Sequence, residues 1–192
     1  TRVFHVGSLS LTDDPSRTAT YEAINIARNS GAVISYDPNY RAALWSDPET
    51  AQLRMQSLIP YVDMMKISDE ETSLLTPYQD PEEAIQYLLR QGVHLVAVTL
   101  GRDGALIGNE NGIVKAEGFS SHAVDTTGAG DSFWGGFLAS YLQEETSPEH
   151  LTRAQMIQFG RVGNAVASLC VERRGGISAI PEMEEIEERL RG

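Results

Sequence analysis

Short apolar runs alternate with helical stripes along the first hundred residues. Apolar runs at 3–6, 32–36, 62–67 and 95–99 predict strands, and the last is apolar nearly throughout, as in a strand buried on both faces of a parallel sheet. Apolar positions at helical spacing predict a helix over 16–29. Two further helices are marked by Asp-Pro pairs, one from Pro48 to about Ile59 and one from Pro81 to just before Gly92. Strands that alternate with helices predict an α/β fold.

The pattern changes after residue 100. Two short runs, 104–108 and 113–116, flank an Asn-Gly turn and predict a β-hairpin. Helices are then predicted over 129–143 and from about 152 to 171. A last helix is expected to have Pro181 at its first position, with glutamates early and arginines late, which suits the helix dipole. With no repeat and no linker-like segment, residues 1–192 are predicted to form a single α/β domain.

Composition narrows the classes of function. The 192 residues include 15 Lys and Arg against 27 Asp and Glu, a net charge of −12 that argues against non-specific nucleic-acid binding. No apolar stretch approaches the roughly twenty residues that a membrane helix needs. The single cysteine, Cys170, excludes an internal disulfide and a cysteine-based zinc site. We therefore expect a cytoplasmic protein. The start without Met, directly on a strand, predicts a chain truncated at its N-terminus.

The segment best suited to carry out chemistry is the loop 125–131, DTTGAGD, which leads into an apolar helix. Small residues before a helix leave backbone N–H groups free, and with the helix dipole these bind anions such as phosphate. Asp131 is placed to take a proton from a hydroxyl while neighbouring N–H groups hold a migrating phosphoryl group. The alternative is a plain glycine turn in which Asp131 only complements the helix dipole.

The residues 125–137, DTTGAGDSFWGGF, closely resemble the second signature of the ribokinase-like (PfkB) carbohydrate kinases. The segment 35–45, SYDPNYRAALW, resembles the Asp-x-Asn-x-Arg segment of the fructokinase branch, and residues 4–11 and 15–17 extend the similarity. The resemblance implies a three-layer α/β/α ribokinase-like fold with a mostly parallel sheet. It also implies ATP-dependent phosphorylation of a sugar hydroxyl, as in a fructokinase. The alternatives are a 2-keto-3-deoxygluconate kinase, a ribokinase, or a non-catalytic nucleotide-binding or oligomerising fragment.

The resemblance assigns roles around the nucleotide. Asp131 would be the catalytic base, and an anion hole would come from the backbone N–H groups of Gly128, Ala129 and Gly130. The segment 99–104, TLGRDG, resembles a Thr-x-Gly-x-x-Gly motif that lies near the nucleotide, and Asn164 falls on a helix that flanks adenine. The motif residues are Thr99, Gly101 and Gly104. Without the resemblance, 99–104 would be read as a strand end followed by turn glycines, and a single Asn164 on a helix would indicate no particular function.

Two further segments have a structural alternative beside the implied role. Asn39 and Arg41, just past a strand end, would lie near the sugar or the transferred phosphate, or else Arg41 forms a surface ion pair. Ser68 and Glu71 match an Asn-x-x-Glu motif in which the Glu helps to organise magnesium through water and the first residue lies near the nucleotide. Ser-x-x-Glu after a strand is also a capping box.

A monovalent-cation site is implied as well, built from oxygen ligands that suit K⁺. The matching positions are Asp125, Thr127, Cys170, Arg173 and Gly175. Where some relatives use a serine as a further ligand, this chain has Ala179, so only a backbone oxygen or water could serve there.

The family's Gly-Gly motif and small β lid have no counterpart in this chain. It therefore corresponds to the C-terminal, nucleotide-binding part of a sugar kinase, and we expect it to be poorly active alone. ATP, Mg²⁺ and K⁺ are the expected cofactors. A small sugar and ATP are the expected partners, with a homodimer as one option and no role for nucleic acid or membrane.

Overall fold

A computed structural model describes all of residues 1–192. The chain divides into two compact units, Thr1–Val98 and Thr99–Gly192. No helix in either is both long and apolar enough to cross a membrane.

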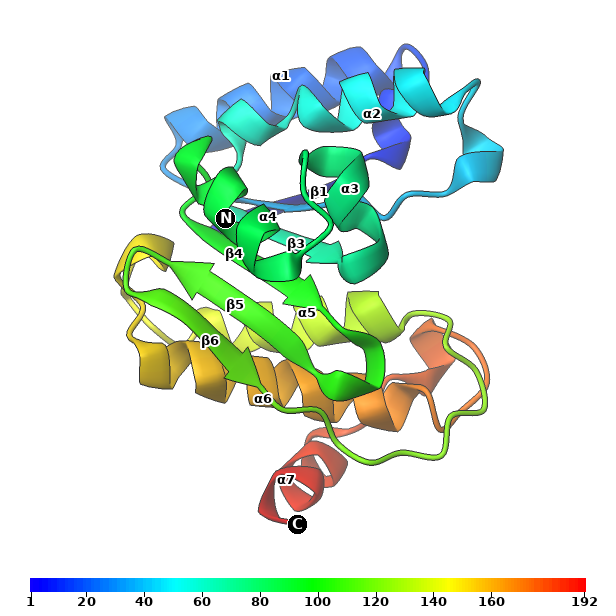
Figure 1. The fold of residues 1–192 in the computed structure, drawn as a ribbon, viewed down its shortest axis with the longest axis vertical. Coiled ribbons are helices and arrows are strands. Elements are labelled where there is room, and N and C mark those ends of the chain that lie inside the picture. Colours follow the sequence, from blue (N-terminus) through cyan, green and yellow to red (C-terminus); the bar gives the residue numbers. More distant parts are fainter. The chain divides into compact units, whose positions relative to one another are not determined.

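Four strands form the sheet of the first unit, in the order β1 (Val3–Gly7), β2 (Val33–Asp37), β3 (Met64–Ser68) and β4 (Leu95–Thr99), whose last residue opens the second unit. The pairs β1–β2 and β2–β3 are parallel. Each strand is followed by helical structure before the next begins, as the alternating pattern predicted. Right-handed crossovers between successive neighbours in a parallel sheet bring the connecting helices to the same face (Figure 1).

The helices of this unit are α1 (Ser16–Asn29), α2 (Pro48–Gln56), α3 (Thr72–Leu75) and α4 (Pro81–Arg90). Two of them, α2 and α4, begin where their capping aspartates predict. Asp47 Oδ1 accepts the Thr50 N–H at 2.7 Å, and Asp80 Oδ1 accepts the Glu83 N–H at 3.0 Å. The predicted end of α2 near residue 59 is wrong: Ile59–Tyr61 forms a separate 3₁₀ turn, because Pro60 has no N–H with which to continue the helix.

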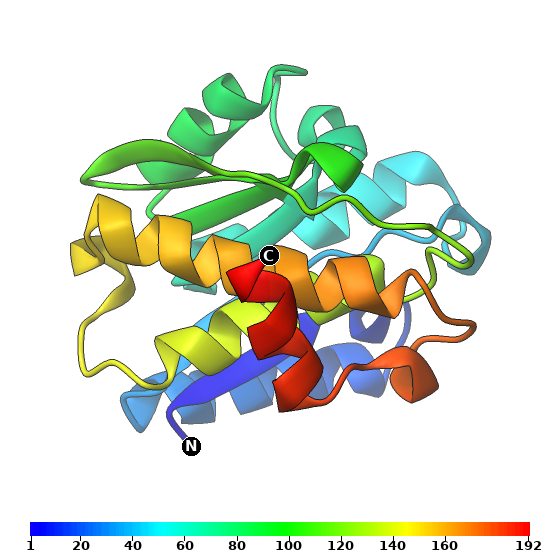
Figure 2. The same cartoon turned by 90° about the horizontal axis from the view of Figure 1, so that it is seen from below.

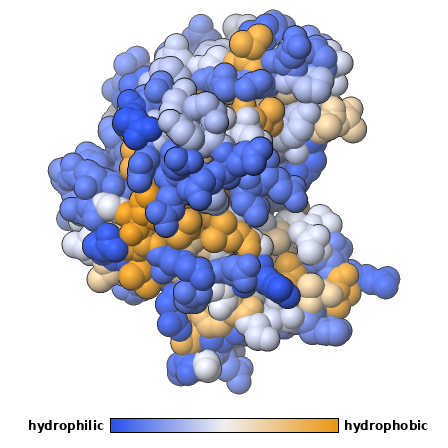
Figure 3. All heavy atoms as spheres, viewed as in Figure 1, coloured by the Kyte–Doolittle hydropathy of each residue, from blue (hydrophilic) through white to orange (hydrophobic).

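The second unit contains the predicted hairpin, β5 (Ala105–Asn109) and β6 (Gly112–Ala116), which pair antiparallel. The strands extend further into the turn than predicted, and only residues 110 and 111 connect them. Asn109 belongs to β5 because it pairs with Gly112, and its buried amide donates to the carbonyls of Pro148 and Leu151, at 3.1 and 2.8 Å. Figure 3 shows hydrophobic residues gathered over the visible side of the hairpin, where Leu106 and Ile113 are half-buried.

Two long helices, α5 (Ala129–Tyr141) and α6 (Arg153–Cys170), lie side by side, and α6 packs against the hairpin (Figures 1 and 2). A Cβ at Gly163 would lie 2.6 Å from the Phe133 carbonyl oxygen, so glycine permits this close approach. The rings of Phe137 and Phe159 meet edge to face with centroids 5.8 Å apart. Phe133 and Trp134 belong to the core, since each is 2% exposed.

The final helix, α7 (Met183–Arg191), packs against α6. The predicted start with Pro181 at the first helical position is wrong. Glu182 is the N-cap, and its N–H donates to the Glu185 carboxylate at 2.9 Å, so the capping box sets the start two residues later. The late Arg189 and Arg191 do lie in the last turn, as predicted.

Candidate active site

The loop before α5 has the form of an anion-binding turn. Gly128 is the N-cap with φ of 78°, a left-handed conformation that favours glycine. The Ala129 N–H donates to the Thr126 carbonyl at 3.2 Å, whereas the N–H groups of Gly128 and Gly130 have no acceptor in the protein. Asp131 is exposed in the first turn. Two of the three N–H groups assigned to the anion hole are therefore available to an anion beside a carboxylate.

Asp125 fastens this loop to a segment fifty residues later. Its Oδ1 accepts the Thr127 N–H at 2.9 Å and its Oδ2 accepts the Gly175 N–H at 3.0 Å. The hydrogen bond from Gly175, followed by those from Thr127, lowers the pKa of Asp125 from 3.8 to about 2. The carboxylate is thus ionised at neutral pH, with hard oxygen atoms in the place where the sequence predicted a cation ligand.

The same region contains the remaining residues of the predicted cation site. Cys170 is buried, and its thiol lies 3.9 Å from the Thr127 carbonyl oxygen, so the two segments do meet. The Cys170 carbonyl accepts the Arg173 N–H at 3.1 Å and keeps a second lone pair. The Arg173 side chain pairs with Glu185 of α7, and the hydrogen bond that it donates to that carboxylate raises the pKa of the guanidinium. No group of three or more His, Cys, Asp or Glu side chains forms a transition-metal site.

The segment 99–104 forms a tight turn between β4 and β5. Gly101 and Gly104 both have positive φ, at 57° and 93°. A Cβ at Gly104 would lie 2.1 Å from the Ala116 carbonyl oxygen, so this position requires glycine whatever else it contacts. Thr99 is half-buried at the end of β4. The turn reading of the two glycines thus accounts for their conformations, and the nucleotide role stays a prediction.

Asn164 has a structural task on α6. It is 6% exposed, and its Nδ2 donates to the carbonyls of Ala116 and Glu117, at 2.9 and 3.0 Å. These bonds tie α6 to the end of β6. Both amide hydrogens are used in this way, so any contact with a nucleotide falls to the amide oxygen.

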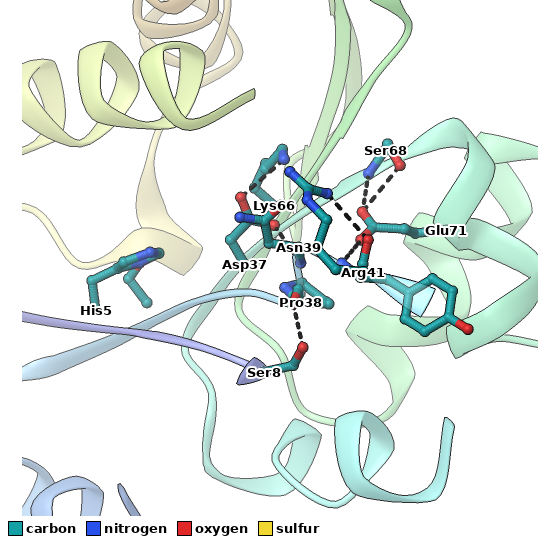
Figure 4. A network of polar contacts seen from close by, with 11 residues as sticks. His5, Ser8, Asp37, Pro38, Asn39, Arg41, Lys66, Ser68 and Glu71 are labelled. Atoms are coloured by element: carbon teal, nitrogen blue, oxygen red, sulfur yellow. Dashed lines mark hydrogen bonds and ion pairs between the residues drawn. The ribbon is translucent and has the colours of Figure 1, made fainter. Parts of the chain in front are cut away.

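In the first unit, the 37–41 loop leaves the carboxyl end of β2 (Figure 4). Asn39 has φ of 48°, the one positive value at a residue other than glycine. Its N–H donates to Asp37 Oδ1 at 3.1 Å, which closes an Asx turn. The exposed Arg41 donates from Nη1 to the Tyr40 carbonyl at 3.1 Å, and none of its contacts is the surface ion pair considered from the sequence.

Ser68 and Glu71 form the capping box that the sequence offered as an alternative, and that structural reading is confirmed. Glu71 Oε2 accepts both the N–H and the hydroxyl of Ser68, at 2.8 and 3.0 Å. Its Oε1 accepts the Tyr40 N–H at 2.8 Å. Glu71 is 8% exposed, and the reach to Tyr40 is a contact that the Ser-x-x-Glu spacing could not reveal.

A buried ion pair at the same strand ends escaped the sequence reasoning. Lys66 Nζ lies 2.9 Å from Asp37 Oδ2, with side chains 7% and 4% exposed. The sequence motif includes Asp37 but not Lys66. The available signal was a single lysine within the apolar run of β3, because a charge in a buried strand needs a buried partner.

Taken unit by unit, the structure joins two groups of predicted residues. In the second unit, the loop 125–131 meets the segment 170–175. In the first, the 37–41 loop meets Ser68 and Glu71, with Lys66 and Asp37 beside them. The donor sets suit the implied groups: free N–H groups at a helix start suit phosphate, and an ionised carboxylate with nearby carbonyls suits a hard cation.

Comparison with known proteins agrees with these features. The family model described as pfkB family carbohydrate kinase matches residues 1–183. "Probable fructokinase-4" of Arabidopsis thaliana is 36% identical over 193 residues, covering 100% of this chain and 58% of that protein. The crystal structure of a fructokinase from Vibrio cholerae O395, with fructose, ADP and calcium bound, superposes with a TM-score of 0.90 at 32% identity, covering 98% of this chain and 60% of that one.

A third relative is a kinase of a different substrate. An aminoimidazole riboside kinase from Salmonella enterica superposes with a TM-score of 0.87 at 26% identity, over 99% of this chain and 63% of that one. The predicted α/β ribokinase-like fold, with its mostly parallel strands, is confirmed by these superpositions. The chain spans about half the length of the curated fructokinases it matches, 52% to 58% for three of them.

Proposed function

The chain belongs to the pfkB family of carbohydrate kinases, and from this we propose that its protein transfers the terminal phosphoryl group of ATP to a sugar hydroxyl, with fructose as the substrate. The observation that carries the proposal is the start of α5. There an exposed carboxylate stands beside two N–H groups without a protein acceptor. Fructose is proposed from the similarity to fructokinases, and ribose and 2-keto-3-deoxygluconate are the competing sugars.

Each residue then has a chemical task. Asp131 accepts the proton of the attacking hydroxyl, and the N–H groups of Gly128 and Gly130 hold the phosphoryl oxygens as charge develops on them. Magnesium, when bound with ATP, neutralises charge on the phosphates. Asp125 and the carbonyl oxygens near it offer the donors for a monovalent cation, whose charge would reinforce the same loop. In the first unit, Asn39 and Arg41 are proposed to bind the sugar.

The decisive variant is Asp131→Asn in the complete gene product that contains this chain. Asparagine keeps the size and still suits a helix start, but it cannot accept the hydroxyl proton. We expect kcat to fall by about 10²–10⁴-fold. ATP affinity should stay within about twofold, because backbone N–H groups and not this side chain hold the phosphates. Glu82→Gln is the matched control, since Glu82 is an exposed acid in the first turn of α4.

Kinetics with fructose, ribose and 2-keto-3-deoxygluconate, calorimetry with ATP, and melting temperatures complete the test. An Asp131→Asn enzyme with near wild-type kcat would leave Asp131 as a helix-start residue and refute the assignment. ATP binding by a wild-type protein that phosphorylates none of the three sugars would favour a non-catalytic nucleotide-binding role instead.

A further inference from the structure

Residues 37–40 of the 37–41 loop are each held by a hydrogen bond or an ion pair, and most of these contacts involve two buried carboxylates (Figure 4). Asp37 is held by Lys66 at 2.9 Å. The Pro38 carbonyl accepts both the N–H and the hydroxyl of Ser8. Asn39 donates to Asp37, and Tyr40 donates to Glu71 at 2.8 Å. So dense a set of bonds on one short loop indicates that these contacts determine its conformation.

The conformation imposed is an unfavourable one. Asn39 has a left-handed backbone, which costs free energy at a residue with a side chain, although asparagine tolerates it better than most. Such residues persist when the surroundings over-determine them. The bonds on either side of Asn39, to Asp37 and to Glu71, do so here.

Glu71 is well placed for this task and has little capacity left for another. Its two oxygens accept three hydrogen bonds from protein donors, at 2.8, 2.8 and 3.0 Å, and a carboxylate offers about four lone-pair sites. The carboxylate is buried, and bonds to a charged acceptor are stronger than neutral ones. Its neighbours Asp69 and Glu70 are exposed on the same 3₁₀ turn.

We propose that Glu71 is a positioning residue, which holds the Tyr40 N–H so that the 37–41 loop presents Asn39 and Arg41 to the sugar. It acts through the backbone of Tyr40 rather than by organising a metal ion. Asp37, fixed by Lys66, supports the other side of Asn39. The part that concerns the sugar rests on the proposed function, whereas the part that concerns the loop does not.

The first arm of the test needs no activity. Amide hydrogen exchange of residues 37–41 is measured by NMR for the wild type, Glu71→Gln, Glu71→Ala and the control Glu70→Ala. We expect the Tyr40 amide to exchange about 10- to 100-fold faster in Glu71→Ala, the factor carried by one charge-assisted hydrogen bond. Glu71→Gln, which keeps an acceptor oxygen, should show a smaller increase, and it also serves if Glu71→Ala fails to fold. Glu70→Ala should match the wild type.

The second arm is kinetic and uses the complete gene product. The KM for fructose should rise about 10-fold or more in Glu71→Ala, while the Mg²⁺ concentration for half-maximal rate stays within about twofold of the wild type. Unchanged exchange at Tyr40 would overturn the proposal. So would a changed Mg²⁺ requirement with an unchanged KM for fructose. If the wild type phosphorylates no sugar, the proposed function fails, and the exchange arm still decides whether Glu71 holds the loop.

Discussion

Two lysine–carboxylate pairs in this chain share the same separation and differ in burial. Lys66 and Asp37 lie 2.9 Å apart with side chains 7% and 4% exposed. Lys115 and Glu117 also lie 2.9 Å apart, with side chains 44% and 73% exposed. Replacing each lysine by methionine removes the charge and keeps much of the length. The comparison between Lys66→Met and Lys115→Met therefore isolates the effect of burial on an ion pair.

The two variants should differ widely in stability. Lys66→Met leaves a buried carboxylate without its cation, a change that costs about 3–5 kcal/mol. For a chain of this length, 1 kcal/mol shifts Tm by about 2–4 °C, so we expect Tm to fall by about 6–20 °C. The exposed pair is screened by solvent, and Lys115→Met should melt within error of the wild type.

Calorimetry or circular dichroism of the 192-residue chain provides the measurement. A double variant, Lys66→Met with Asp37→Asn, removes the stranded charge and keeps an oxygen for the Asn39 N–H. It should regain more than half of the lost Tm. Equal shifts for the two lysine variants, or a double variant no more stable than Lys66→Met, would refute the reasoning that an uncompensated buried charge dominates.

Two further predictions concern the second unit. Gly104→Ala should destabilise the chain by more than about 1 kcal/mol, because φ is 93° and the added Cβ would lie 2.1 Å from the Ala116 carbonyl oxygen. Gly135→Ala, with open space on α5, should stabilise by about 0.5–1 kcal/mol, and urea unfolding compares the two. For Asp125, a folded-state pKa below the ordinary one gives stability that is present above about pH 4 and lost as the pH falls. The Tm difference between the wild type and Asp125→Asn should therefore be constant down to about pH 5 and should narrow between pH 3.8 and about 2. A difference that persists at the lowest pH would show that the bonds of Asp125 do not depend on its charge.

The elements of the fold were predictable where local chemistry decides them. The run 16–29 forms α1 with the predicted bounds. Asp47 and Asp80 cap α2 and α4, the helices whose starts they predict. The four-residue helix α3 was not predicted, since a single turn has no periodicity to detect. The end of α2 and the start of α7 were misplaced because boundaries depend on single hydrogen-bonding groups.

The candidate site was predictable only in part, for a related reason. Contacts between residues near in sequence, such as Ser68 with Glu71, can be foreseen from spacing. The bonds from Tyr40 to Glu71 and from Lys66 to Asp37 join residues 31 and 29 positions apart, and no local pattern specifies them. For the bond from Lys66 to Asp37, the sequence offered one indication, a single lysine within the apolar run of β3.

The loop before α5, which is part of the proposed active site, is also held by contacts with residues that are distant in the sequence. Asp125 holds the Gly175 N–H, and a Cβ at Gly128 would come within 3.1 Å of the Gly176 Cα. The segment that ends in Gly175 and Gly176 is held in turn by α7, through Arg173 with Glu185 and Glu172 with Arg189.

The last helix carries no residue with a proposed chemical role. Its two ion pairs nevertheless fix the segment against which the loop before α5 is folded. The free N–H groups at the start of α5 are useful to an anion only while that loop keeps its shape. We therefore expect the geometry of the site to respond to changes in α7, although the motif at 125–137 that identifies the site ends well before this helix begins at Met183.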